Sequence, residues 1–263
     1  RGDKGMMLTN VFTKSVRDRW RGTTIAFVSL MPMFLLAMYL YRNFDMNIYQ
    51  EIPEAYKGIM GIPAGVNAAT LAISVFLAGA GSWVLVGLAI ASGSASIASE
   101  ENKGTIGLLL GNPKSRTNVL VSKAGAMTLL IFLIVAALWG GTHLIGRILS
   151  VSIGELSVWS LSLHLFVITL FHGCLAIAIG AWSGNKGAAA GITTGVMIIS
   201  IFAVGLLPLI DGWENVAKVF PWYYLNGSDP LFNGVNWGHI GILSGGIILF
   251  VFISVIGVNR RDL

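Results

Sequence analysis

Charged side chains are scarce in this chain. Asp, Glu, Lys and Arg make up only 11% of the 263 residues, and 55% are hydrophobic, whereas soluble domains carry about 25% charged residues. The mean hydropathy of +0.77 agrees with this imbalance. These values exclude an ordinary soluble domain and predict an integral membrane protein.

Several chemical motifs are also missing. The single cysteine, Cys174, excludes a disulfide within the chain. The sequence has no phosphate-binding loop, since GAWSGNKG (residues 180–187) lacks the required order, and it has no His-Glu zinc motif and no serine nucleophile elbow. We therefore expect no cofactor and no metal in this chain. The basic balance, with a pI near 9.5, concerns the bilayer and not a nucleic acid.

Long charge-free runs are present instead, and a helix that crosses the hydrocarbon needs about 20 mostly apolar residues. The run from Gly58 to Ser99 begins with several Gly and a Pro, which indicates an entry segment before a single span. The sequence predicts an all-α membrane protein, one transmembrane domain over residues 1–263, with six spans at about 23–41, 71–97, 124–146, 159–182, 188–210 and 240–258.

The distribution of positive charge predicts the orientation. With both termini in the cytoplasm, only Arg42, Lys57, Arg147 and Lys218 fall on the outer side, and all other Lys and Arg fall inside. Cytoplasmic loops are the ones that concentrate Lys and Arg. We expect a multi-pass protein of the cell (cytoplasmic) membrane.

Two segments outside the spans have their own pattern. In residues 8–21, Phe12, Val16, Arg19 and Trp20 recur at helical spacing beside a basic face, which predicts a helix lying in the membrane interface. Residues 211–239, before the last span, are rich in Trp and Tyr. We expect this outer segment to dip back into the bilayer, because such aromatics settle at the interface.

The loop over residues 100–123 is the longest one on the predicted cytoplasmic side. Glu100 and Glu101 follow Ser99, a residue suited to cap a helix, and acids favour the positive end of a helix. Pro113 ends the helix, because the residue before proline avoids helical geometry. The pattern predicts a short cytoplasmic helix between two spans.

Chemistry inside the bilayer is limited to three histidines. The predicted spans contain no Asp, Glu, Lys or Arg, but they contain His143, His164 and His172. His164 and His172 are about 12 Å apart along one helix, too far to share a metal. We expect interhelical hydrogen bonds from these side chains, with a place on a substrate path as the alternative.

The sequence EENKGTIGLLLGNPKSRTNVLVSK (residues 100–123) resembles the signature of type-2 ATP-binding-cassette exporter permeases. The likeness extends over nearly the whole chain. It includes the predicted interfacial helix over residues 8–21, called the elbow helix in this family and followed by the end of RDRWRG, the six spans and the outer segment before the last span. It implies a coupling helix that docks on a separate ATPase. The implied coupling residues are Glu100, Glu101, Lys103, Gly104, Thr105, Pro113 and Arg116.

The resemblance implies a transport subunit and not an enzyme. ATP and Mg²⁺ would be bound by the partner ATPase, and a second permease, the same chain or a different one, would complete the exporter. The apolar spans favour an apolar or amphipathic substrate such as a drug, an antibiotic or a lipid. Two alternatives stay open: an ATP-independent channel or secondary carrier, and a membrane enzyme that uses the three histidines.

Overall fold

The computed structural model describes residues 3–42, 51–62, 68–96, 113–151, 153–154 and 156–260. This part of the chain is helical and contains no strand. The longer helices are α1 (Asp3–Arg42), α5 (Gly81–Ser94), α8 (Pro113–Ile148), α9 (Val158–Ser183), α10 (Lys186–Leu206) and α13 (Trp237–Arg260). The shorter elements are α3 (Glu54–Met60), α4 (Ala68–Ile73), η1 (Ser74–Ala80), η2 (Leu207–Leu209), η3 (Val216–Val219), α11 (Tyr223–Asn226) and α12 (Pro230–Asn233).

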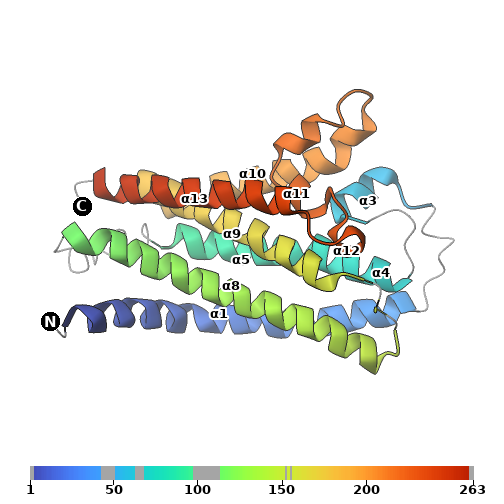
Figure 1. Ribbon diagram of the computed structural model, residues 1–263, viewed down its shortest axis with the longest axis horizontal. Coiled ribbons are helices and arrows are strands. Elements are labelled where there is room, and N and C mark those ends of the chain that lie inside the picture. Colours follow the sequence, from blue (N-terminus) through green and yellow to red (C-terminus); the bar gives the residue numbers. More distant parts are fainter. Residues whose placement is uncertain are drawn as a thin grey trace.

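Six helical stretches are long and apolar enough to cross a membrane, which confirms the predicted number: Val11–Tyr41, Thr70–Ser94, Thr117–Ile148, Val158–Ser183, Lys186–Leu209 and Trp237–Arg260. They run side by side along the long axis of the molecule (Figure 1). The start of α1 and the end of α13 lie at the same end of the bundle, which we call the terminal end. The opposite end is the distal end.

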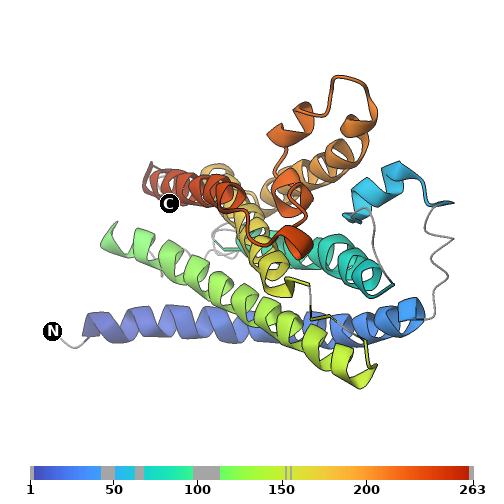
Figure 2. The ribbon, with the colours of Figure 1, turned by 45° about the vertical axis from the view of Figure 1, so that its right-hand side comes forward.

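Helix α9 forms the centre of the bundle. It packs against α5, α8, α10 and α13, and Figure 2 shows it between these helices after the view is turned. Its most apolar window is 72% buried, against 22% for the span in α1 and 17% for α13. The core is therefore built around α9, and α1 and α13 present most of their surface to the surroundings.

The first helix differs from the prediction of a separate interfacial helix over residues 8–21. These residues are helical, but they continue into the first span as one 40-residue helix. A helix of that length extends about 60 Å, and a bilayer core is about 30 Å thick. Gly22 keeps helical geometry at the junction, and Arg19, three residues before it, is bonded to the neighbouring helices.

The second span has a break that the sequence pattern did not indicate. It runs from α4 through the π-helical turn η1 into α5, and Gly79 leaves helical geometry (φ −94°, ψ −111°). The hydroxyl of Ser82 donates to the carbonyl oxygens of Ala78 (2.8 Å) and Gly79 (2.6 Å). These bonds give hydrogen-bond partners to backbone carbonyls near the break, as side chains commonly do in interrupted membrane helices. At Gly81 a Cβ atom would lie 2.5 Å from the carbonyl oxygen of Phe76, so the turn requires glycine there.

The entry segment before the second span contains a short helix, α3. It packs against the distal end of α10. At Gly58 a Cβ atom would lie 3.0 Å from the backbone of Gly205. The two glycines therefore allow α3 and α10 to approach backbone to backbone, the small-residue contact that is common between membrane helices.

The segment before the last span inserts aromatic side chains into the bundle. Trp222 and Leu225 are fully buried. The backbone amide of Trp222 donates to the hydroxyl of Ser200 on α10 (2.7 Å), and its ring lies 6.1 Å from the ring of His172. His172 is about 21 Å along α9 from Val158, close to the middle of that helix. The start of the segment, from Asp211 to Val216, is exposed.

Candidate functional site

The terminal ends of α1, α5 and α8 are joined by one arginine. Arg19 of α1 donates from Nη1 to the carbonyl oxygen of Lys123 (3.1 Å). Its Nη2 donates to the carbonyl oxygen of Ser92 (3.1 Å) and to the hydroxyl of Ser96 (2.9 Å). Ser92 lies in the last turn of α5, and Lys123 lies in the third turn of α8. We call Arg19, Ser92, Ser96 and Lys123 the Arg19 hub.

A second cation strengthens the same junction. Lys123 is buried, with 7% of its surface exposed, and its Nζ donates to the carbonyl oxygen of Ser96 (2.7 Å). The hydroxyl of Ser96 also donates to the carbonyl oxygen of Ser92 (2.9 Å). The last carbonyls of a helix lack partners inside the helix and carry partial negative charge. Arg19 and Lys123 therefore act together as a cap on α5, supplied by two other helices.

The hub lies at both ends of the segment that links α5 to α8. Ser96 is the last described residue before that segment, and α8 begins at Pro113. Arg19 and Lys123 bond the end of α5 to the first turns of α8. A displacement of either end of the segment would therefore move α1, α5 and α8 together. The geometry is that of a mechanical junction between three helices.

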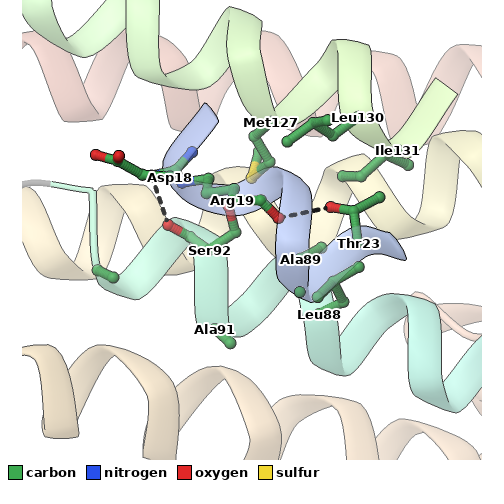
Figure 3. A pocket seen from close by; sticks show the side chains of 12 residues that line it. Asp18, Arg19, Thr23, Leu88, Ala89, Ala91, Ser92, Met127, Leu130 and Ile131 are labelled. Atoms are coloured by element: carbon green, nitrogen blue, oxygen red, sulfur yellow. Dashed lines mark hydrogen bonds between the residues drawn. The ribbon is translucent and has the colours of Figure 1, made fainter. Parts of the chain in front are cut away.

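A pocket of about 230 Å³ lies beside the hub (Figure 3). Three helices line it. Helix α1 supplies Asp18, Arg19, Gly22 and Thr23; α5 supplies Leu88, Ala89, Ala91 and Ser92, with Ala95 following it; α8 supplies Met127, Leu130 and Ile131. The hydroxyl of Thr23 donates a hydrogen bond to the carbonyl oxygen of Arg19 (3.1 Å). The pocket thus has apolar walls and a charged rim.

The structure places the predicted elbow residues in different surroundings. Arg19 is in the hub. Phe12 packs over Gly125 of α8, where a Cβ atom would lie 3.6 Å from its ring. Val16 is half-buried, and Trp20 remains 51% exposed.

The predicted coupling residues Glu100, Glu101, Lys103, Gly104 and Thr105 lie outside the described residues. Pro113 and Arg116 lie in the first turn of α8. The coupling role of all seven stays a prediction.

The sequence pattern placed Arg19 on the predicted interfacial helix and ended the predicted cytoplasmic loop at residue 123, but it gave no indication of Ser92 or Ser96. The available signal was two serines one helical turn apart at the end of a span. Such small polar residues can hold a cation at a helix end. Their spacing alone does not identify which cation reaches them.

The three predicted histidines do not converge. His164 and His172 are fully buried on α9, and each Nδ1 bonds the carbonyl oxygen four residues earlier, in Ser160 and Ile168 (both 2.9 Å). The expectation of interhelical hydrogen bonds is therefore wrong for these Nδ1 atoms, because each lies within hydrogen-bond distance of a carbonyl oxygen of its own helix. Their Nε2 atoms have no hydrogen-bond partner among the described residues.

His143 lies apart on α8, where its ring contacts that of Trp139 at 5.2 Å. The described histidine that joins His164 is His239 of α13, with ring centroids 6.3 Å apart. Rings of Tyr223 and Tyr224 surround His239. Within the described part of the chain, no group of three or more His, Cys, Asp or Glu could hold a metal ion.

Comparison with known proteins gives one family. The sequence model of the ABC-2 family transporter proteins matches residues 9–263. The match covers nearly the entire chain, including all six candidate spans. No curated protein matches the chain.

Proposed function

The chain belongs to the ABC-2 transporter family, a family of membrane permease subunits of ABC transporters, and from this premise we propose that a separate ATPase subunit drives it by docking on residues 100–116. ATP and Mg²⁺ would be bound by that subunit. In this proposal the terminal end of the bundle faces the cytoplasm and the protein resides in the cytoplasmic membrane, in keeping with the excess of Lys and Arg at that end.

The observation that carries the proposal is the Arg19 hub. Residues 97–112 connect the end of α5 to the start of α8. The chain just before this segment and the early turns of α8 are bonded to each other and to α1. An ATPase that moves this segment would act on three packed helices together and would tilt them as rigid bodies, one of the common modes of switching between states. A loop joined to the helices by flexible chain would not transmit that displacement to them.

Charge reversal tests the docking. The change Glu100→Lys with Glu101→Lys is expected to abolish copurification of the ATPase and stimulation of ATP hydrolysis, while thermal unfolding of the permease stays unchanged. The matched control reverses Asp211 and Glu214, two exposed acids at the distal end, and is expected to leave both readouts intact. Full ATPase stimulation in the Glu100/Glu101 variant would refute docking on this segment.

An apolar or amphipathic substrate, carried outward, fits the interior best. The core around α9 is formed by aliphatic and aromatic side chains, with a few hydroxyls and imidazoles among them. Intramembrane carboxylates and cations are the usual marks of an ion path, and none occurs among the described residues of α9, or of α10 beyond Lys186 at its first position. ATP-dependent uptake of a lipophilic dye or a fluorescent phospholipid into inside-out vesicles would test this; uptake without ATP would instead support a carrier.

A second permease is expected to pack against α10. Gly187, Gly191 and Gly195 repeat along this helix at four-residue spacing, and a Cβ atom at Gly191 or Gly195 would meet nothing within 4 Å. The stripe is therefore not used inside one chain, and small-residue stripes permit close contact between helices. Oxidation of Gly191→Cys should give a crosslinked dimer in membranes, whereas Gly245→Cys on the exposed side of α13 should not.

A further inference from the structure

The pocket beside the hub has a shape and a polarity that the transport proposal does not explain. Its depth is formed by Ala89, Met127, Leu130 and Ile131, and its rim carries the charged Arg19 with its neighbour Asp18. We propose that it holds one acyl chain of an anionic phospholipid from the adjacent bilayer leaflet, with the lipid phosphate bound by Arg19. This site is independent of the transported substrate.

The position of the pocket along the helices suits a lipid of one leaflet. On α8 it reaches from Met127, one turn beyond the buried Lys123, to Ile131, a distance of about 6 Å along the helix axis. The hydrocarbon core of a bilayer is about 30 Å thick. The pocket therefore begins at the level of the helix-end cations and ends within the nearer leaflet.

The size and walls of the pocket favour an acyl chain. At about 230 Å³ it is smaller than the 300–1,000 Å³ typical of sites for drug-sized ligands. Figure 3 shows Leu88 and Ala89 of α5 on one side and Met127, Leu130 and Ile131 of α8 on the other. A flexible hydrocarbon chain fits such a narrow apolar space without needing polar partners in its depth.

The charge at the rim favours an anionic headgroup. A guanidinium has five N–H donors, and the hub uses three hydrogen bonds from Arg19, which leaves donor capacity for a phosphate oxygen. Lys14, Arg17 and Arg21 are exposed on the same two turns of α1, against the one acid Asp18. Clusters of Lys and Arg beside a span attract anionic lipids.

Two glycines provide a matched pair of variants. Gly22 lines the pocket, and a Cβ atom there would meet nothing within 4 Å. Gly87 of α5 has equally open space but does not line the pocket. Gly22→Leu therefore places a side chain in the pocket, whereas Gly87→Leu makes the same chemical change on a neighbouring helix outside it.

The experiment is native mass spectrometry of the full chain with its copurifying subunits, titrated with dioleoyl-phosphatidylglycerol or dioleoyl-phosphatidylcholine. We expect one phosphatidylglycerol per chain, held about tenfold more tightly than phosphatidylcholine. Gly22→Leu should lower its affinity about tenfold, because the contacts of even two methylene groups account for that factor. Gly87→Leu should bind as the wild type does. Equal binding by Gly22→Leu and Gly87→Leu would overturn the site, and equal binding of the two lipids would overturn the preference for an anionic headgroup.

A photoreactive probe fixes the location. Phosphatidylglycerol with a diazirine in its acyl chain should label Met127, Leu130 or Ile131 in nanodiscs, and Gly22→Leu should remove this labelling. Arg19→Gln should reduce phosphatidylglycerol binding to the phosphatidylcholine level, whereas Lys218→Gln, at an exposed cation of the distal end, should retain the preference. Labelling confined to α10 and α13, or a preference that survives Arg19→Gln, would refute the assignment.

Discussion

Removal of the Arg19 guanidinium tests whether the hub holds three helices together. Arg19→Gln deletes hydrogen bonds to Ser92, Ser96 and Lys123. A bond from a charged donor contributes about 1.5–3 kcal/mol in soluble proteins, but interhelical bonds in a membrane protein average about 0.6 kcal/mol. The acceptor at Ser92 keeps a second partner, the Ser96 hydroxyl, so the deletion does not orphan it. We therefore expect the lower range, a loss of about 2 kcal/mol in the free energy of unfolding.

The assay is reversible unfolding in mixed micelles with increasing SDS, followed by tryptophan fluorescence. Arg17→Gln is the control, because Arg17 is exposed on the same helix and its loss should change the free energy of unfolding by less than about 0.5 kcal/mol. A double-mutant cycle of Arg19→Gln with Ser96→Ala isolates the bond of 2.9 Å between these side chains. The expected coupling energy is about 0.5–1.5 kcal/mol.

Two results would refute the reasoning. Equal stabilities of Arg19→Gln and Arg17→Gln would show that the hub bonds add nothing beyond surface charge. Single effects of Arg19→Gln and Ser96→Ala that add to within about 0.3 kcal/mol would show that the two side chains do not interact.

Three further predictions concern the distal end and the broken span. Ser200→Ala should destabilise the protein by about 1–3 kcal/mol, because it leaves the buried amide of Trp222 without its acceptor; an unchanged thermal unfolding temperature would contradict this. Gly81→Ala should lower that temperature, since its Cβ would overlap a backbone oxygen, while Gly87→Ala, in open space, should not. Burial raises the pKa of Asp229 above its ordinary value, so the folded state binds its proton more tightly and stability falls as pH rises from the unfolded pKa through the folded one. Asp229→Asn should remove that slope in a pH series of unfolding temperatures; an identical slope in the variant would refute the assignment.

The hydrophobic pattern was sufficient to predict the helical class and the six spans, because a bilayer requires long apolar helices and permits few alternatives. It also placed Arg19 and Lys123 next to spans. It did not predict that residues 8–21 continue into the first span, since the pattern of an interfacial helix and that of a helix extension are the same. The break at Gly79 was equally hidden among other small residues.

What the sequence by itself determined is therefore the number, length and order of the apolar helices, together with a distribution of positive charge that predicts their orientation. These properties depend on each segment alone and on its transfer from water to lipid. Only the tertiary structure decided that Arg19 and Lys123 cap α5, that Trp222 reaches the middle of α9, and that His143 lies apart from His164 and His172. Each of these depends on how helices distant in sequence pack together, and a hydrogen-bond partner is chosen by that packing and not by the residue's own segment.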